Sequence, residues 1–456
     1  MSELSFIENF ANTKWNTIFD WLNTLQSQVS IKASNIYNSC DIRYSGFKVA
    51  NVDCNLFPAG FKNLSSDGIR RSTQEMISFI NTKKQNGLLD KNAKNIIIVS
   101  ESHTRNLPYL HGVLQLKNIF ENAGFNVRIA TFDLKKFKVK LSGNVIEVYK
   151  LIKKDNKIYL ECDGYKNQNT TSMAEKSNEG DIIFENCPET GRQIIKDKAL
   201  NLFEADFLVI NNDMTVQSPP ALQDTNIKTF PETRLGWHLR KKSSHFVKYK
   251  EIVEQFSKYF NIDPWFFSAF FESVDNIDIK EGIGLDILAR SVENIFSKVS
   301  EKYKEYNIKL EPKVYAKANA GTYGMGVMML NNVEEVENLN KAGRNKLDSI
   351  KAGVKNTSFV IQEGVPSLIN IDNNPAELVS YGFNLKPCDF FYRYHPDKDS
   401  NNSLNAPGAR FMNKLNFDLI FKDNLTSLNT DVIKEIAILR LSYLASSLAF
   451  ISAGTE

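Results

Sequence analysis

A lysine and a group of glycines lie between two short apolar stretches in the last third of the chain. Residues 314–317 are typical of a strand that ends at Lys317, and residues 327–330 resume a strand. Between them lies the turn Gly321-Thr322-Tyr323-Gly324-Met325-Gly326. Glycine lets the backbone adopt φ > 0 and approach phosphate oxygens closely, and a lysine adds a positive point charge. The pattern therefore predicts a phosphate-binding hairpin; the alternative is a tight hairpin with a solvated lysine.

The position of these glycines distinguishes the turn from two other nucleotide-binding loops. Rossmann and Walker loops both lead into the N-terminus of a helix. Here the glycines join two predicted strands with GxxGxG spacing, and the sequence contains no Gly-Lys-Ser/Thr. A glycine-rich hairpin with a lysine on the preceding strand is the ATP-grasp arrangement, so we expect ATP as a cofactor.

A further apolar strand is predicted downstream, within residues 358–366. In ATP-grasp folds the adenine lies against such a strand, where backbone groups bind the adenine edge and a nearby carboxylate binds the ribose hydroxyls. We therefore expect the nucleotide to contact the end of this strand, at Gln362, Glu363, Gly364 and Val365.

A magnesium site is expected beyond this strand. Mg²⁺ prefers hard oxygen ligands and keeps several waters, so one or two carboxylates suffice. Glu377, on a predicted strand, and Asn405, in a turn, are the candidate ligands. Arg393 is expected to point inward and to stabilise the transferring γ-phosphate. For each of these residues the alternative is a surface charge or a turn cap. Three further acids are candidate ligands, of which the last two fit a solvated loop better: Asp389, Asp397 and Asp399.

Two polar loops follow predicted strands in the first half of the chain. A strand at 95–100, a helix at 107–123 and a strand at 125–130 form a βαβ unit, and 207–210 predicts another buried strand. In open α/β sheets, ligands bind at the carboxyl ends of the strands. We therefore expect the amino-acid substrates to contact Ser102, His103, Arg105, Asn106, Asn211, Asn212 and Asp213.

These elements predict an α/β fold with an α+β C-terminal part: a doubly wound N-terminal domain followed by an ATP-grasp-like nucleotide-binding domain. The first ninety residues have apolar residues at helical spacing, and 246–300 is also predicted to be helical. Three domains are proposed: a helical segment (1–92), an α/β substrate-binding, pre-ATP-grasp-like domain (93–245), and an ATP-grasp-like domain with a helical insertion (246–456).

Charge and cysteine content exclude several functions. The chain has 56 basic and 53 acidic residues, a balance that argues against a nucleic-acid partner. Its five cysteines have no CxxC spacing, so we expect reduced thiols and no zinc site. The N-terminus has no signal-peptide pattern, and the apolar stretch 432–453 contains charged residues, which favours a packed helix over a membrane span. A cytoplasmic location is expected.

Residues 314–328, Val-Tyr-Ala-Lys-Ala-Asn-Ala-Gly-Thr-Tyr-Gly-Met-Gly-Val-Met, closely resemble a signature of the proteobacterial, ATP-grasp-like type of glutamate–cysteine ligase. Other stretches that resemble the motifs of this family follow the family's order, and the matches extend from about 95 to 415. These stretches are 100–106, 210–213, 236–246, 262–265, 362–365, 391–395 and 404–408.

The resemblance implies ATP-dependent ligation of the glutamate γ-carboxylate to cysteine through γ-glutamyl phosphate, the first step of glutathione biosynthesis. It implies roles for Lys317, the 321–326 loop, residues 362–365, Glu377, Arg393 and Asn405. The basic run after Gly236-Trp237 adds Arg240 as a substrate candidate, and Lys241 or Lys242 as phosphate contacts. Two alternatives stay open: another ATP-grasp carboxylate–amine ligase with different amino acids, and a non-catalytic nucleotide-binding regulator. Assembly into a homo-oligomer is also left open.

Overall fold

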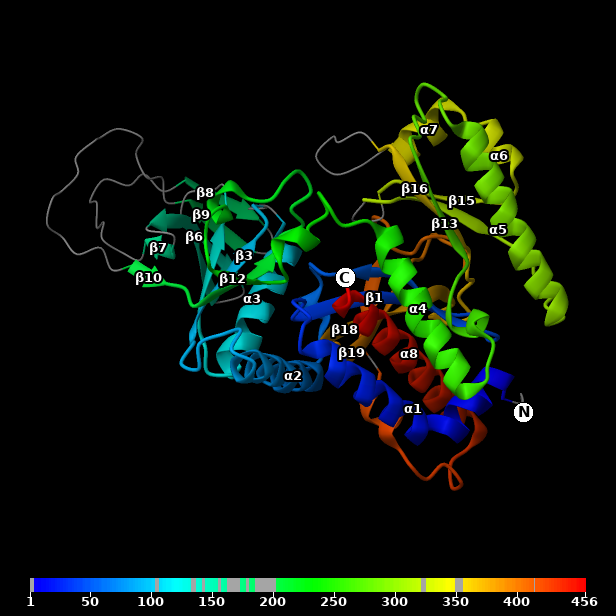
Figure 1. Cartoon of the computed structure of the whole chain (residues 1–456), viewed down its shortest axis with the longest axis horizontal. Coiled ribbons are helices and arrows are strands. Elements are labelled where there is room, and N and C mark those ends of the chain that lie inside the picture. Colours follow the sequence, from blue (N-terminus) through cyan, green and yellow to red (C-terminus); the bar gives the residue numbers. More distant parts are fainter. Residues whose placement is uncertain are drawn as a thin grey trace, which may run out of the picture.

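The computed structural model describes residues 4–102, 106–132, 137–141, 144–154, 157–161, 173–177, 180–184, 202–320, 325–348, 356–413 and 415–456. Its strands form three sheets, which Figure 1 shows as separate groups, with the sheet that contains β1 and β18 between the other two. The chain therefore has a mixed α/β fold, as the sequence predicts.

The central sheet joins the two ends of the chain. Its order is β2-β1-β18-β19-β20, and all neighbouring strands are antiparallel. A short strand, β17, pairs with β18 at one end. The strands are β1 (Tyr37–Tyr44), β2 (Val49–Asn55), β17 (Asn370–Ile371), β18 (Asn374–Phe383), β19 (Lys386–Tyr394) and β20 (Arg410–Met412).

A second sheet contains the predicted βαβ unit. Strands β12, β11, β3, β4 and β6 are parallel neighbours, and the remaining strands continue the sheet in antiparallel pairs. The strands are β3 (Asn95–Ser100), β4 (Asn126–Thr131), β5 (Phe137–Leu141), β6 (Asn144–Lys154), β7 (Lys157–Glu161), β8 (Met173–Ser177), β9 (Gly180–Phe184), β10 (Leu202–Glu204), β11 (Phe207–Asn211) and β12 (Lys228–Phe230).

The third sheet contains the predicted glycine-rich hairpin. Its order is β13-β16-β14-β15, and every pair is antiparallel. The strands are β13 (Phe271–Asp275), β14 (Val314–Ala318), β15 (Val327–Leu330) and β16 (Ser358–Glu363). The hairpin of β14 and β15, and the β16 strand beside it, confirm the strands predicted at 314–317, 327–330 and within 358–366.

Helices cover the sheets. The α-helices are α1 (Phe6–Ser30), α2 (Ser66–Gln85), α3 (Leu107–Asn122), α4 (Lys242–Phe260), α5 (Leu285–Glu305), α6 (Glu334–Glu337), α7 (Lys341–Asp348) and α8 (Thr430–Gly454). Short 3₁₀ turns are η1 (Phe61–Asn63), η2 (Pro220–Leu222), η3 (Thr233–Leu235), η4 (Pro264–Phe267) and η6 (Phe417–Phe421). Helix α1 starts at a capping box, in which Ser5 and Glu8 each bind the backbone N–H of the other.

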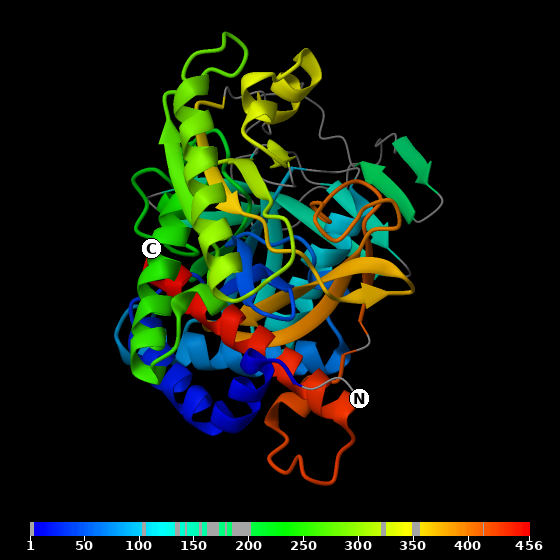
Figure 2. The same ribbon diagram turned by 90° about the vertical axis from the view of Figure 1, so that its right-hand side faces the viewer.

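Helix α8 is the predicted apolar helix near the C-terminus. It packs against α1, α4 and the back of the central sheet, and both views show it alongside these helices (Figure 1, Figure 2). By length and composition it is the one candidate membrane span in the described residues, but 94% of its most apolar stretch is buried inside the protein. The burial agrees with the prediction of a packed helix.

Two helical predictions are wrong in part. Residues 37–55, predicted to be helical, form β1 and β2, because these strands pair with β18 from the other end of the chain. The aromatic-rich stretch 246–300 is helical in α4 and α5, but it also contains β13, which pairs with β16. The proposed domain boundaries stay predictions.

Candidate active site

A small cavity lies between the central sheet and the sheet of the glycine-rich hairpin. Its volume is about 60 Å³. Both sheets and the start of α4 contribute polar side chains to its wall. The cavity is lined by Asp41, Arg43, Val52, Asp53, Lys242, Tyr315, Lys317, Met325, Val327, Gln362, Glu363, Val365, Glu377, Arg393, Ser403 and Asn405.

Lys317 extends from β14 towards the central sheet. Its Nζ donates to Gln362 Oε1 at 2.6 Å and to the Val52 carbonyl at 2.9 Å, so it bridges the two sheets. Burial lowers the pKa of Lys317 to about 8, although the nearby Asp53 carboxylate opposes this shift. The ammonium is therefore still largely protonated near neutral pH, as a phosphate ligand requires.

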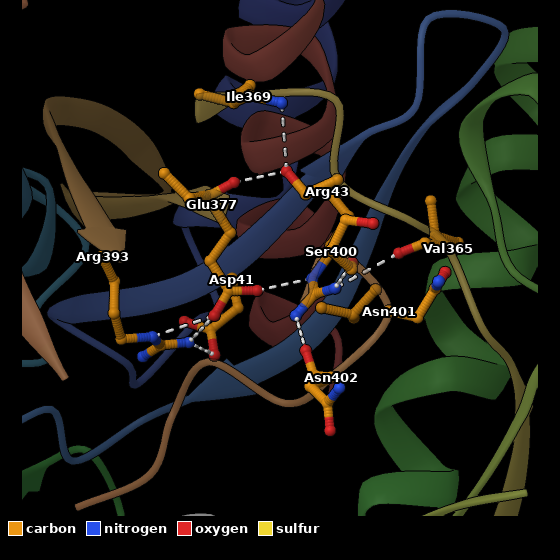
Figure 3. Close-up of polar contacts among 12 residues, drawn as sticks. Asp41, Arg43, Val365, Ile369, Glu377, Arg393, Ser400, Asn401 and Asn402 are labelled. Atoms are coloured by element: carbon orange, nitrogen blue, oxygen red, sulfur yellow. Dashed lines mark hydrogen bonds and ion pairs between the residues drawn. The ribbon is translucent and has the colours of Figure 1, made fainter. Parts of the chain in front are cut away.

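A chain of alternating charges crosses β1, β18 and β19 on the cavity side (Figure 3). Arg393 donates from Nε and Nη2 to Glu377 Oε1 at 2.9 and 2.6 Å, and Nη2 also donates to Asp41. Arg43 donates from Nε to Glu377 Oε2 at 2.6 Å. Glu377 therefore lies between two guanidinium groups. Glu377 and Arg393 are direct partners across β18 and β19, which places both side chains on one face.

Burial and the neighbouring charges act against each other on the two carboxylates of this group. Burial raises the pKa of Asp41 to about 6, against the effect of Arg393 and with that of Glu377. Burial also acts to raise the pKa of Glu377, but Arg43 and Arg393 together hold that pKa below its usual value. Glu377 is therefore ionised at neutral pH, and its negative charge depends on the two arginines.

Asp53 forms a second charged group beside Lys317. Its carboxylate accepts from Lys242 Nζ, so Lys242, one of the two predicted phosphate lysines, is at the cavity. Lys241, the other, pairs instead with the exposed Asp275. Burial acts to raise the pKa of Asp53, but Lys242 and Lys317 hold it below its usual value.

The carboxylate of Glu363, one of the predicted nucleotide contacts, is bound within the protein. Lys48 Nζ donates to Oε1 at 2.7 Å, and neither side chain is exposed to solvent. Trp265 Nε1 and the Phe270 backbone N–H also donate to this carboxylate, at 3.1 and 2.9 Å. The carboxylate therefore accepts hydrogen bonds from three groups of the protein itself. It fixes the end of β16 against the turn between β1 and β2.

The other predicted nucleotide residues are only partly described. Gly321, Thr322, Tyr323 and Gly324 lie outside the described residues. Gly326 adopts φ +63° at the end of the turn, a backbone conformation that favours glycine. Gly364 lies so close to the Lys313 carbonyl that a Cβ would be 2.8 Å from its oxygen, so this position requires glycine. Asn405 lines the cavity beside Glu377 and Arg393.

The predicted substrate loops lie at neighbouring carboxyl ends of β3 and β11, as expected. None of their described residues lines the cavity. Asn211 is buried, with its side chain bonded to Tyr109 Oη and to the Pro58 carbonyl, and Asn106 caps α3. Asn212 donates to the Ser100 carbonyl, and the Asp213 backbone N–H donates to Glu101. Ser102 is half-buried in the first loop; His103 and Arg105 lie outside the described residues.

Arg240, also a substrate candidate, does not line the cavity. It binds Glu456 through Nε and Nη2 at 2.6 and 2.9 Å and donates from Nη1 to the Cys54 carbonyl. His245 adds a contact of 3.0 Å to the same carboxylate. Burial acts to raise the pKa of Glu456, but Arg240 and His245 lower it to about 2.

Comparison with known proteins identifies the family. The family model described as GshA, glutamate-cysteine ligase, matches residues 8–170 and 164–453. The chain belongs to the glutamate–cysteine ligase family.

Among solved structures, the chain is similar to the crystal structure of a "Putative gamma-glutamylcysteine synthetase" from Methylobacillus flagellatus KT. The two are 26% identical, with a TM-score of 0.77, over 99% of this chain and 97% of that chain. D-alanyl-alanine synthetase A from Vibrio cholerae O1 biovar eltor str. N16961 is 10% identical, with a TM-score of 0.28, over 77% and 81% of the two chains, and it carries no argument. A comparison with curated proteins found no match.

For a glutamate–cysteine ligase family member, the unexpected part of the cavity is the contribution of β1 and β2. Asp41, Arg43 and Asp53 were not predicted to be site residues. A signal exists in the sequence: Asp41 and Arg43 are two residues apart, and the residues between and beside them are Cys40, Ile42 and Tyr44. Such alternation is typical of a strand with one polar face, but it is hidden in a segment predicted to be helical.

Proposed function

We propose that the chain joins the γ-carboxylate of L-glutamate to the amine of L-cysteine at the expense of ATP, the first step of glutathione biosynthesis. The γ-carboxylate attacks the γ-phosphate of ATP and gives γ-glutamyl phosphate and ADP. The cysteine amine then displaces phosphate. Family membership supports the ligase activity, and the family is ATP-dependent and typically needs a metal ion.

The observation that carries this proposal is that one cavity collects the predicted phosphate and metal residues from separate parts of the chain. Lys317, Gln362, Glu377 and Arg393 come from β14, β16, β18 and β19, and Asn405 follows β19. Phosphoryl transfer depends mainly on positioning and on charge neutralisation. Lys317 and Arg393 are the cations that we assign to the transferring phosphate.

The donor set of the cavity fits magnesium. Glu377 supplies a buried carboxylate, and Asn405, whose side chain has an amide oxygen, also lines the cavity. Mg²⁺ needs only one or two carboxylates besides phosphate oxygens and waters, so this set is sufficient for it. When bound, the metal neutralises charge on the β- and γ-phosphates.

The size of the cavity implies that the two sheets move apart when nucleotide binds. A volume of about 60 Å³ is well below the ~300–1,000 Å³ of ligand pockets. The contacts that bridge the sheets at the cavity, from Lys317 to Val52 and from Arg43 to Val365, must then open. We propose an ATP-grasp-like mode, in which nucleotide enters between the hairpin and β16 and closure excludes water from the acyl phosphate.

The substrate loops and the location are also part of the proposal. We retain Ser102, His103, Arg105, Asn106 and residues 211–213 as the candidate contacts of the amino-acid substrates, because both loops follow parallel strands. The reaction is placed in the cytoplasm, where ATP is abundant.

The test is ADP release by the purified protein with Mg²⁺-ATP and glutamate, cysteine, both or neither. Strong release only with both, together with γ-glutamylcysteine in the product, would support the proposal. Release with another pair of amino acids would show that the substrates are different but would still support a ligase activity. If ATP binds but no pair stimulates turnover, the chain is a nucleotide-binding regulator and the ligase assignment fails.

A further inference from the structure

Arg393 Nη2 lies between two carboxylate groups from neighbouring strands. It is 2.6 Å from Glu377 Oε1 on β18 and also donates to Asp41 Oδ2 on β1. Both carboxylates are buried, with exposed fractions of 8% for Asp41 and 2% for Glu377. One positively charged nitrogen therefore bridges two oxygens, and Figure 3 shows both acids converging on this guanidinium.

The same two oxygens are a donor pair suited to a divalent cation. Carboxylate oxygens are the hard ligands that Mg²⁺ prefers, and two of them with substrate phosphates and waters complete its shell. Asp41 lies directly opposite Asp53 across β1 and β2, and like charges in this position destabilise a sheet unless cations compensate them. The negative charge of Asp41 and Asp53 therefore requires cations beside these carboxylates.

The facing wall offers an independent observation. Gln362 and Tyr315 are direct partners on β16 and β14, both are more than nine-tenths buried, and both line the cavity. Among the described residues, Gln362 Nε2 and Tyr315 Oη have no hydrogen-bond partner. The Lys317 contact to Oε1 identifies the oxygen of the Gln362 amide, which leaves its Nε2 donor buried and without a partner in a residue that lines the cavity. These two walls suit an anionic ligand with a bound cation. The unpaired donors would bind the anion, and the carboxylate pair would bind the cation.

We propose that Asp41 is a further ligand of the divalent cation, beside Glu377, and that the cation and Arg393 compete for these two carboxylates. Arg393, displaced from the carboxylates by the cation, would then be free to bind the phosphate oxygens of the nucleotide, so that one exchange would place both charges. Asp41 thereby makes β1, from the N-terminal part of the chain, a part of the metal site. The inference rests on the proposed function only for the identity of the anion.

The experiment measures Mn²⁺ binding to the full chain by titration calorimetry and by the electron paramagnetic resonance of free Mn²⁺, with no substrate present. Asp41→Asn should weaken binding by about tenfold or more. Arg393→Met should tighten it, because the competing cation is gone. Arg393→Lys, which keeps a positive charge at the site, should not tighten it. The double variant Asp41→Asn/Arg393→Met should lose the gain.

Asp389→Asn is the matched control. Asp389 is also on β19 and largely buried, but it binds Ser65 and Arg71 and does not line the cavity, so Mn²⁺ affinity should be unchanged. Thermal unfolding checks that each variant is folded. Should Asp41→Asn not fold, the comparison of Arg393→Met with Arg393→Lys still decides the question.

The inference is overturned if Arg393→Met binds Mn²⁺ no more tightly than the parent chain, or if folded Asp41→Asn binds it equally well. Neither result contradicts the assignment of ligase activity, because ADP release tests that activity separately. Conversely, the chain could show no ligase activity while Asp41→Asn weakens Mn²⁺ binding and Arg393→Met tightens it. That result would support the cation site and contradict the proposed function.

Discussion

Replacement of Lys48 by methionine tests the buried pair that fixes β16 to the central sheet. Lys48 Nζ lies 2.7 Å from Glu363 Oε1 and 4.1 Å from the centre of the Trp265 ring, and both side chains of the ion pair have zero exposure. Methionine keeps the length and apolar packing of the side chain. The variant therefore leaves a buried carboxylate whose positive partner has been removed.

The expected cost follows from these contacts. Breaking a buried ion pair on one side costs about 3–5 kcal/mol, because the remaining charge is uncompensated. Glu363 keeps the Trp265 and Phe270 N–H donors, which places the expected loss near the lower end, about 3 kcal/mol. In the double variant Lys48→Met/Glu363→Gln the amide oxygen still accepts from both donors and no charge is buried. The double variant should therefore lose at least ~2 kcal/mol less than the sum of the single variants.

Urea unfolding, followed by tryptophan fluorescence and by circular dichroism, measures these free energies. Lys250→Met is the matched control, since Lys250 forms an exposed pair with Glu254 on α4 and should cost less than ~0.5 kcal/mol. A loss below ~1 kcal/mol for Lys48→Met, or additive losses in the double variant, would refute the claim that this pair holds β16 in place.

Three further predictions concern the cavity and its surroundings. Lys317→Met should lower the ligation rate by roughly 100-fold or more, because it removes a cation from the transferring phosphate; steady-state kinetics with a thermal-unfolding control measures this, and a wild-type rate would contradict it. Tyr315→Phe should leave the unfolding free energy unchanged within ~0.5 kcal/mol, since the Tyr315 hydroxyl has no partner among the described residues. The same variant should weaken nucleotide or substrate binding. A large loss of stability would show that the hydroxyl is bonded. Glu456→Gln should cost about 3 kcal/mol at pH 7, because the pKa of Glu456 falls to about 2 on folding. That stability is present above the unfolded pKa near 4.5 and is lost as pH falls towards 2, so unfolding curves of the two chains should converge in acid; a constant difference would contradict the assignment.

The sequence was informative where local pattern and local structure coincide. The β14–β15 hairpin, β16, and the parallel strands β3, β4 and β11 each lie within a short stretch whose apolar residues and glycines identify it. The inward direction of Arg393 was also predictable, because Glu377 and Arg393 lie on strands joined by a short turn. In these cases the local pattern identifies the strand, whichever partner it pairs with.

The role of the N-terminal strands was not predictable in the same way. Asp41 and Arg43 reach the cavity only because β1 pairs with β18, more than 300 residues away. Their alternation follows the helical periodicity of α1, which led the whole N-terminal segment to be predicted as helical. No local signal indicates which partner a strand will find. Long-range pairing therefore decided the placement of these site residues.

The polar loops show the opposite difficulty. Asn211 was predicted as a substrate contact because it follows a buried strand, yet its amide and carbonyl groups bond to Tyr109 and Pro58. Glu363 likewise binds Lys48 and Trp265. A polar residue at a strand end is needed as much to satisfy buried backbone and side-chain groups as to bind a ligand, and sequence alone does not separate these roles.

The central claim is that glutamate is activated as an acyl phosphate before cysteine reacts. The most direct measurement uses glutamate labelled with heavy oxygen in its γ-carboxylate, with Mg²⁺-ATP, cysteine and the purified chain, and analyses the released phosphate by mass spectrometry. We predict that γ-glutamylcysteine forms and that labelled oxygen appears in the phosphate. Dipeptide formation with unlabelled phosphate, or no dipeptide from active, ATP-binding protein, would contradict the account.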